Sequence, residues 1–394
     1  MPLIAPPLSL YVHIPWCVRK CPYCDFNSHA QAGALPVEEY VRALLADLDR
    51  DLAAFGAALA RRPLHSVFFG GGTPSLFPPE AIARVLDGVA ARLELPRDAE
   101  VTLETNPGTV EHGRFDGYLA AGVNRLSLGV QSFDDDKLRR LGRIHSAGDA
   151  ERAVRQAQDA GYADINLDLM YALPEQTLGG ALDDVERALA LEPTHVSHYQ
   201  LTLEPNTLFA AKPPPLPDED GAWDMQEACQ VALADAGFAQ YEVSAYARAG
   251  RRAKHNLNYW RFGDYLGIGA GAHGKLSDAA QGRIVRTTKV KLPRSYLDRA
   301  ARRESFGTQA DVAAIDLPFE FMMNALRLEE GVDAPLFGER TGLATATIAA
   351  PLARARQRGW MVEDPARLAA TALGRRFLND VIGSFLPEGP RAEG

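Results

Sequence analysis

The chain has 394 residues, of which 46% are apolar and 24% are charged, an ordinary composition for a globular protein of two or three domains. Its formal net charge of −9 and the lack of a long basic run argue against a nucleic-acid partner. No apolar run approaches the roughly 20 residues of a membrane-spanning helix, and the N-terminus MPLIAPPLSL does not resemble a secretory signal, so we expect a cytoplasmic protein.

The first half of the chain alternates apolar runs typical of strands with amphipathic stretches typical of helices. The longest helical stretch runs from about Val37 to Arg62. The predicted strands are Leu8–Pro15, His65–Gly72, Glu100–Pro107, Arg125–Ser132, Asp164–Pro174 and His195–Pro205. Strand–helix units in succession predict an α/β fold with a parallel sheet, curved into a partial (β/α)6 barrel of the TIM type. In such barrels the functional residues lie at the C-terminal ends of the strands.

The second half of the chain begins at a Pro-rich, acidic segment, KPPPLPDED from Lys212 to Asp220, which is typical of a domain boundary. We expect a barrel domain over 1–215, a second domain over 216–305 and a C-terminal module over 306–394. The second domain contains the run HNLNYWRFGDYLGIGAGAHGK. The third has helical segments around Phe319–Leu328 and Thr345–Arg358, then a strand-turn-strand pattern and a helix, which is the order of a winged-helix-like module.

Three of the four cysteines are crowded into eight residues, as Cys17-Val-Arg-Lys-Cys21-Pro-Tyr-Cys24. This crowding in a chain without a secretory signal favours metal over disulfides. Three thiolates can hold a [4Fe–4S] cluster and leave one iron open to a further ligand. The alternatives are unligated thiols or a zinc site completed by His13 or His29. Cys229 stands alone in a helical stretch and is predicted to be a small buried side chain.

Several motifs in fixed order resemble the radical S-adenosylmethionine (SAM) proteins of the coproporphyrinogen dehydrogenase group. They begin with Tyr11-Val-His-Ile-Pro-Trp-Cys17 and the two following cysteines. The others are Gly70-Gly71-Gly72-Thr73-Pro74-Ser75, Glu104-Thr-Asn-Pro107, Arg125-Leu-Ser-Leu-Gly-Val-Gln131-Ser-Phe133, Leu141-Gly-Arg143 and Asn166-Leu-Asp168-Leu-Met-Tyr-Ala-Leu-Pro174. The resemblance spans nearly the whole chain and implies a radical SAM barrel with a [4Fe–4S] cluster on Cys17, Cys21 and Cys24, whose open iron binds SAM.

The same resemblance implies which residues bind SAM. Glycines after a strand let the backbone approach a ligand closely, and a carboxylate at a strand end can accept from ribose hydroxyls. The residues expected at the SAM amino-acid moiety are Tyr11, Gly71, Gly72 and Thr73, with Glu104 at the ribose. Gln131, Arg143 and Asp168 fall at positions that in the dehydrogenase help to hold a second SAM. Taken singly, such residues are equally typical of structural roles: glycines in tight turns, carboxylates at helix caps, and Gln or Arg in polar pairs across the barrel mouth.

Two features differ from the dehydrogenase. That enzyme carries a further cysteine two positions after the third, where this chain has Phe26, and a substantial arm before its cluster, where this chain has only sixteen residues. Both differences resemble the HemW group of haem chaperones. The favoured hypothesis is a protein that binds haem and transfers it to apo-haemoproteins, respiratory ones being the expected acceptors. The alternative is an oxygen-independent coproporphyrinogen III dehydrogenase, which performs radical oxidative decarboxylation.

His255-Asn256-Leu257-Asn258-Tyr259-Trp260 resembles the HNxxYW motif of the HemW group. An imidazole can ligate haem iron and aromatic rings can cover a porphyrin face, so His255 is the expected axial ligand. His198 and His273 are alternatives, and a purely structural role for the motif is the competing interpretation. The sequence leaves open the haem donor, the acceptor, a homodimer and a peripheral membrane contact.

Overall fold

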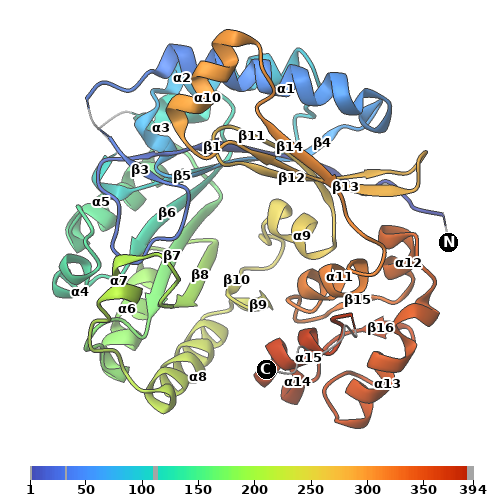
Figure 1. Ribbon diagram of the computed structural model, residues 1–394. Coiled ribbons are helices and arrows are strands. Elements are labelled where there is room, and N and C mark those ends of the chain that lie inside the picture. Colours follow the sequence, from blue (N-terminus) through green and yellow to red (C-terminus); the bar gives the residue numbers. More distant parts are fainter. Residues whose placement is uncertain (1, 32, 110–113, 388–394) are drawn as a thin grey trace.

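The computed structural model describes residues 2–31, 33–109 and 114–387. Its centre is a curved sheet with the strand order β14-β13-β12-β11-β1-β4-β5-β6-β7-β8-β10-β9 (Figure 1). The parallel barrel strands are β1 (Leu8–Ile14), β4 (Leu64–Gly71), β5 (Glu100–Thr105), β6 (Arg125–Gln131), β7 (Ile165–Tyr171) and β8 (His195–Gln200). The order β1-β4-β5-β6-β7-β8 confirms the predicted parallel sheet, and its bounds agree with the sequence pattern to within a few residues.

The sheet continues beyond β1 with strands from the second half of the chain. β11 (Asp264–Ile268) pairs with β1 in parallel, and β12 (His273–Asp278), β13 (Arg283–Lys289) and β14 (Gly307–Asp311) follow antiparallel. At the other edge, β10 (Ala245–Ala247) pairs antiparallel with β8, and β9 (Ala239–Glu242) pairs antiparallel with β10. Hydrogen bonding therefore runs unbroken across the predicted boundary near residue 215, and the domain division stays a prediction.

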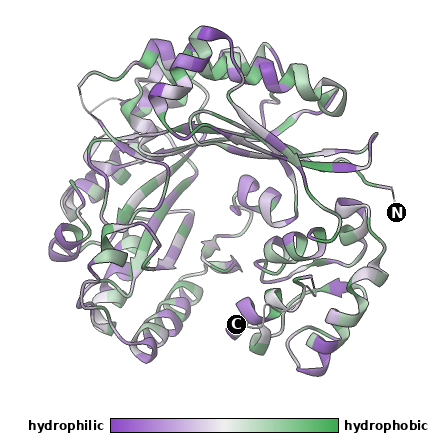
Figure 2. Ribbon diagram, in the orientation of Figure 1, coloured by the Kyte–Doolittle hydropathy of each residue, from purple (hydrophilic) through white to green (hydrophobic). Residues whose placement is uncertain are grey.

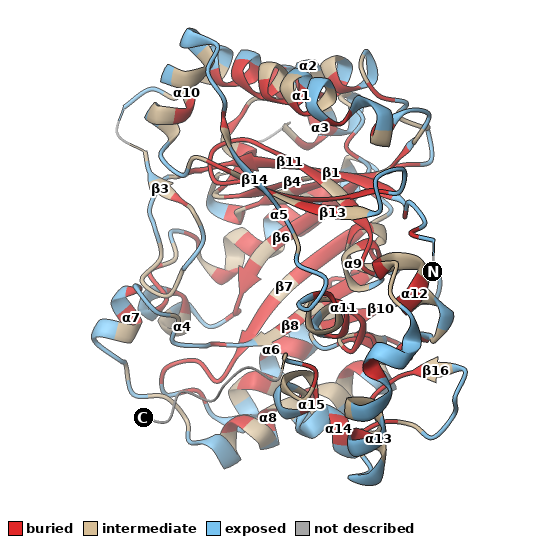
Figure 3. Ribbon diagram, turned by 45° about the vertical axis from the view of Figure 1, so that its right-hand side comes forward, coloured by how far each residue is buried: buried red, intermediate tan, exposed pale blue. Residues whose placement is uncertain are grey.

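Helices cover the convex side of this sheet (Figure 1). They are α1 (Val37–Leu59), α2 (Pro79–Ala90), α3 (Arg114–Ala120), α5 (Ala147–Asp159), α6 (Leu178–Ala190), α8 (Glu219–Asp235) and α10 (Pro293–Arg302). Their apolar faces and the sheet form the main core, which is green in Figure 2 and red in Figure 3. The short α4 (Asp135–Arg140) and α7 (Leu208–Ala211) lie outside this core. Cys229 on α8 is fully buried in this core, as predicted. No helix of the described residues is both long and apolar enough to cross a membrane.

The C-terminal region has its own apolar core. Its elements are α11 (Leu317–Ala325), β15 (Val332–Asp333), α12 (Pro335–Thr341), α13 (Ala349–Gln357), β16 (Arg367–Leu368), α14 (Ala372–Arg376) and α15 (Leu378–Gly383). The predicted strand-turn-strand corresponds to an antiparallel bridge between Met361 and Ala370. The comparison with a winged helix stays a prediction.

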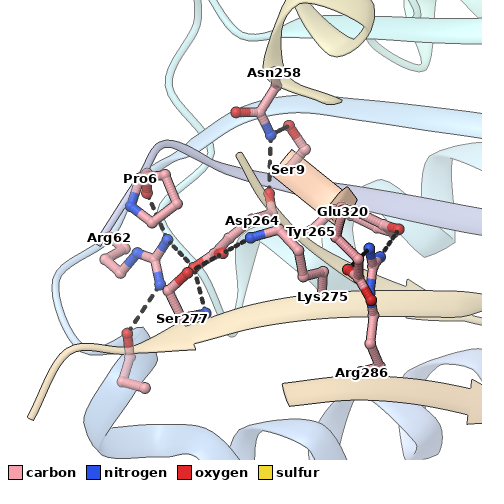
Figure 4. Close-up of polar contacts among 11 residues, drawn as sticks. Pro6, Ser9, Arg62, Asn258, Asp264, Tyr265, Lys275, Ser277, Arg286 and Glu320 are labelled. Carbon is pink, nitrogen blue, oxygen red and sulfur yellow. Dashed lines mark hydrogen bonds and ion pairs between the residues drawn. The ribbon is translucent and has the colours of Figure 1, made fainter. Parts of the chain in front are cut away.

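One short helix, α9 (Lys254–Trp260), lies on the concave side of the sheet (Figure 1). Its Asn258 donates to the Ser9 hydroxyl on β1 and to the Asp264 carbonyl on β11, each at 2.9 Å (Figure 4). Asn256 donates to the Tyr241 hydroxyl at 3.1 Å. Because these partners belong to separate parts of the chain, the helix is held at a defined position inside the curve.

The side chain of Asp264 extends this anchor (Figure 4). It is fully buried and accepts from Arg62 Nη2 at 2.8 Å and from Lys275 Nζ at 2.9 Å. The Ser277 backbone and hydroxyl add bonds of 2.9 and 2.8 Å. A buried carboxylate thus neutralises a buried lysine and joins β11 and β12 to the segment after α1.

Candidate active site and adjoining cavity

The three clustered cysteines lie on a loop whose two ends are paired. β2 (Trp16–Cys17) and β3 (His29–Ala30) form a short parallel ladder, so the eleven residues between them, 18–28, leave and return at one place. All three thiols are free and half-buried. Such a loop can present several thiolates to one inorganic core while its ends stay attached to the barrel.

Each thiol has a polar neighbour. Thr73 Oγ1 donates to Cys17 Sγ at 3.5 Å, Ser28 Oγ lies 3.7 Å from Cys24 Sγ, and Arg143 Nη1 donates to Cys21 Sγ at 3.8 Å. Burial raises the pKa of the Cys17 and Cys24 thiols. A metal that binds the thiolates must therefore displace protons from groups that the empty protein keeps neutral.

The two histidines considered as zinc ligands make other bonds. His13 Nε2 bonds to the Asn27 carbonyl at 3.0 Å, and His29 Nε2 lies 3.3 Å from Asn27 Oδ1. Across the part of the chain that the structure describes, no three His, Cys, Asp or Glu side chains converge as a single ion requires.

The glycine loop after β4 lies directly beside the cysteine loop. Gly71 has a positive φ of 111°, and a Cβ on Gly72 would lie 2.5 Å from the Trp16 carbonyl oxygen. The Thr73 amide donates to that same carbonyl at 2.7 Å. The sequence therefore requires glycine here so that two backbone segments can touch and leave room for a ligand.

Two half-buried carboxyl groups lie at the inner side of the barrel. Glu104 accepts from the Gly71 amide at 3.2 Å, and burial together with the charge of Asp168 raises its pKa to about 8. Asp168 accepts from Ser127 Oγ at 3.1 Å and from Asn166 Nδ2 at 2.8 Å, and burial raises its pKa as well. Neighbouring carboxyl groups of this kind repel each other when both are ionised, and a cation or a hydrogen-bond donor would relieve that repulsion.

Besides the two carboxyl groups, Arg143 also fits a bound ligand. It lies against Cys21, and its Nη2 donates to the Gly129 carbonyl at 2.7 Å. Its Nε is buried without a hydrogen-bond partner, an unsatisfied donor that needs an explanation. Gln131, in a left-handed conformation with φ of 70°, accepts from the Tyr199 hydroxyl at 2.8 Å. These groups face a shared space.

That space is a cavity of about 470 Å³, which we call the cysteine cavity. It brings together most of the residues expected at the site: Cys17, Cys21, Cys24, Gly71, Gly72, Thr73, Glu104, Gln131, Arg143 and Asp168. It is also lined by residues that the sequence reasoning missed: Tyr23, Ser127, Ser197 and Tyr199. Tyr23, directly before the third cysteine, was visible in the motif, whereas Ser197 and Tyr199 lie on β8 at positions that no motif singled out.

Tyr11 lies on the wall of a second cavity, of about 570 Å³, which we call the aromatic cavity. Its hydroxyl bonds to His13 Nδ1 at 2.8 Å and its ring stacks on Phe68. The two cavities share Asp25, Phe26, Gly71 and Glu104. Tyr11 is thus adjacent to the cysteine cavity without lining it.

His255 does not line either cavity. The residue is only 6% exposed, its Nδ1 lies 2.5 Å from Glu100 Oε1, and its ring packs on Phe68. Glu100 also accepts from the Lys254 and His255 amides. Burial opposes ionisation of the Glu100 carboxyl, but its contacts with His255 and with these amides hold its pKa well below the usual range. In this conformation the imidazole is a hydrogen-bond partner of Glu100 at the N-terminus of α9 and is buried away from both cavities, so the expected axial role is not supported by its position.

The alternative histidines differ from each other. His198 on β8 is buried, stacks on Tyr171 and has its pKa lowered to about 4 by burial. His273 at the start of β12 is exposed and lines the aromatic cavity. Of the two, only His273 is accessible to a bound ligand.

Comparison with known proteins agrees with this geometry. Residues 11–188 match the Radical SAM superfamily and residues 312–377 match the HemN C-terminal domain. The chain is 52% identical to the heme chaperone HemW of Haemophilus influenzae and 51% identical to that of Escherichia coli, each over 97% of this chain and 99% of the other. Among solved structures, the radical SAM enzyme coproporphyrinogen III oxidase (HemN) of Escherichia coli superimposes with a TM-score of 0.81 at 23% identity, over 97% of this chain and 90% of the other.

The HemN structure supports the fold alone at that identity, whereas the HemW relatives match at high identity over their full length. Radical SAM membership implies a [4Fe–4S] cluster and SAM, and the free thiols, the glycine loop and the unsatisfied Arg143 Nε fit them. The chain therefore belongs to the HemW family within the radical SAM superfamily.

Proposed function

We propose that this protein is a haem chaperone, which binds haem and transfers it to apo-haemoproteins. The observation that carries the proposal is the 52% identity to a heme chaperone over nearly the whole of both chains. Transfer requires a haem site that is accessible and of moderate affinity, because a fully enclosed haem could not be handed on. The open aromatic cavity beside the cysteine loop is compatible with that requirement.

We also propose the roles of the site residues. Cys17, Cys21 and Cys24 would ligate the [4Fe–4S] cluster, which supplies an open iron for SAM when it is bound. The glycine loop would accept the SAM amino-acid moiety, with Glu104 as acceptor for the ribose hydroxyls. Gln131, Arg143 and Asp168 line the same cavity. We therefore assign them to the SAM that binds at the cluster, in preference to a second SAM.

The competing function is that of a coproporphyrinogen III dehydrogenase. The resemblance to that enzyme implies a further cysteine at position 26, where this chain has a phenylalanine that is 60% exposed. A phenyl ring can neither carry a proton nor ligate iron, so it supplies none of the chemistry that a thiol would supply there. This difference favours the chaperone.

The deciding experiment is a paired assay on anaerobically reconstituted, full-length protein. Haem is added to one sample, and coproporphyrinogen III with SAM and a reductant to the other. We expect a stoichiometric change in the Soret band in the first and no decarboxylation in the second. Protoporphyrinogen formation in the second sample, without haem binding in the first, would refute the chaperone function.

The partners are proposed more coarsely. Haem and apo-haemoprotein acceptors follow from the proposed function, as does the need for a haem donor. A cytoplasmic location, a homodimer and a peripheral membrane contact stay predictions. Incubation of the haem-loaded protein with an apo-haemoprotein, followed by separation of the two, would measure the transfer directly.

A further inference from the structure

The aromatic cavity has the size and lining of a site for a flat ligand that has an apolar face and charged groups at its edge. Its volume of about 570 Å³ falls within the usual range for cofactor sites. Its walls come from the cysteine loop and from β1, β4, α9, β11, β12, β13 and α11, and include the rings of Phe26, Tyr259, Trp260 and Tyr265. The exposed ring of Phe26 lies between this cavity and the cysteine cavity, because it lines both. A ligand here would lie next to the proposed cluster and SAM.

The HNxxYW segment places two of those rings. Its polar residues are used for anchoring: His255 pairs with Glu100, Asn256 with Tyr241, and Asn258 with Ser9 and the Asp264 carbonyl. The aromatic residues that follow line the cavity instead. Trp260 Nε1 is buried without a hydrogen-bond partner, so this wall keeps an unsatisfied donor. The motif therefore presents an aromatic surface and does not present its own histidine.

The cavity has two histidines, and they differ in availability. His13 has both ring nitrogens engaged, with the Tyr11 hydroxyl at 2.8 Å and the Asn27 carbonyl at 3.0 Å. His273 contacts only Thr288 Oγ1, at 3.3 Å from its Nδ1, and its Nε2 has no hydrogen-bond partner among the residues that the structure describes. A hydrogen bond at one nitrogen that leaves the other free is the usual arrangement of a metal-ligating imidazole.

The charges around His273 suit an anionic ligand. Partial burial and the positive charges of Lys291 and Arg286 lower the pKa of the imidazole, so that it is neutral and can donate a lone pair to iron. Arg286 is itself held by Glu320 at 2.6 Å and by the Tyr265 hydroxyl at 3.0 Å. Lys291 is exposed at the rim and forms no ion pair with a described residue. A free lysine beside an apolar cavity can pair with a carboxylate that projects from the ligand.

We propose that the aromatic cavity is the haem site, with His273 Nε2 as an axial ligand, Tyr259 and Trp260 against the porphyrin and Lys291 at a propionate. The proposal rests on the haem-chaperone function and assigns that function to a site. It places haem against Phe26 and Glu104, which also line the cysteine cavity. Because the two cavities share this wall, a ligand in one can influence ligand binding in the other.

The test is a haem titration of full-length, cluster-reconstituted protein, read as the Soret spectrum after removal of free haem. We expect His273→Ala to shift the Soret band and to weaken haem binding about tenfold or more. Added imidazole should restore the wild-type band, because truncation leaves space for it. Lys291→Glu should weaken binding without moving the band. His65→Ala is the matched control, since His65 lies at the opposite end of the barrel, at the start of β4, and should leave both affinity and spectrum unchanged.

The outcomes separate the site from the function. Wild-type protein that binds haem while His273→Ala keeps the same band and affinity would overturn the site and leave the chaperone function standing. Loss of haem by His273→Ala together with a lowered melting temperature and no rescue by imidazole would overturn the axial role. Wild-type protein that binds no haem would overturn the proposed function and the site together.

Discussion

The buried ion pair between Asp264 and Lys275 allows a quantitative test of how the walls of the aromatic cavity are held. Asp264 is 0% exposed and Lys275 is 2% exposed, and their charged atoms lie 2.9 Å apart. Asp264→Asn preserves the shape but leaves the ammonium of Lys275 buried without a counter-charge. Removal of one partner from a buried pair costs about 3–5 kcal/mol, so we expect about 3 kcal/mol of destabilisation, because Lys275 keeps its contact with the Phe262 ring at 4.3 Å. That loss corresponds to a fall of roughly 3–5 °C in the melting temperature of a chain of this length.

A second substitution separates charge from packing. If the cost comes from the uncompensated ammonium, the double variant Asp264→Asn, Lys275→Met should recover more than half of the loss. The pH dependence of the stability of Asp264→Asn provides an independent test, because the direction of the change can be predicted. Burial already lowers the pKa of Lys275, and without Asp264 it should fall further, so the unfolded chain binds more protons than the folded one. The stability of Asp264→Asn should then rise as pH increases from about 7 toward the pKa of an unfolded lysine, roughly 10.4.

Thermal melts followed by circular dichroism, on apo-protein at several pH values, measure all of these quantities. Lys275→Met alone should cost less than Asp264→Asn, because Asp264 retains Arg62 and Ser277 as partners. The reasoning is refuted if the double variant is as unstable as the sum of the two single variants, or if the melting temperature of Asp264→Asn does not change with pH.

Further predictions concern the two cavities. Replacement of any one of the three loop cysteines by Ser should remove the iron–sulfur absorbance, while Cys229→Ala should keep a full complement of iron and sulfide; a loop variant that also keeps both would contradict the ligand assignment. Because the pKa of Glu104 is raised to about 8, its ionisation costs stability as pH rises from about 5 to 8, so the stability of Glu104→Gln relative to wild type should increase over that range in thermal melts. Glu104→Gln should also weaken SAM binding about tenfold by equilibrium dialysis; equal affinity would exclude the carboxylate as a ligand. His255→Ala should lower the melting temperature, because it leaves the buried Glu100 carboxylate without its partner, and should leave the haem spectrum unchanged; a shifted Soret band would restore His255 as the axial ligand.

The regular part of the fold could be read from the chain, because it depends on local patterns. Apolar runs separated by amphipathic helices predicted the parallel strands to within a few residues, with the ends of β7 and β8 placed too late, and the cysteine spacing with its accompanying motifs indicated the family. Most of the SAM-site residues follow strands of one parallel sheet, whose carboxyl ends share an edge. They could therefore be expected together before any coordinates were known, and the structure places them around one cavity.

The haem side of the molecule could not be predicted in the same way. The motif around His255 resembles a ligand site in sequence, but its histidine is occupied by Glu100, which lies 155 residues earlier in the chain. His273 stands in a glycine-rich stretch with no distinguishing pattern, so the sequence offered it only as an alternative to His255; the structure places it on the aromatic cavity, because β12 is added to the barrel sheet through β11. Local sequence thus determined the barrel and the cysteine loop, whereas tertiary structure alone decided which histidine keeps a free nitrogen, because hydrogen-bond partners distant in sequence compete for each ring.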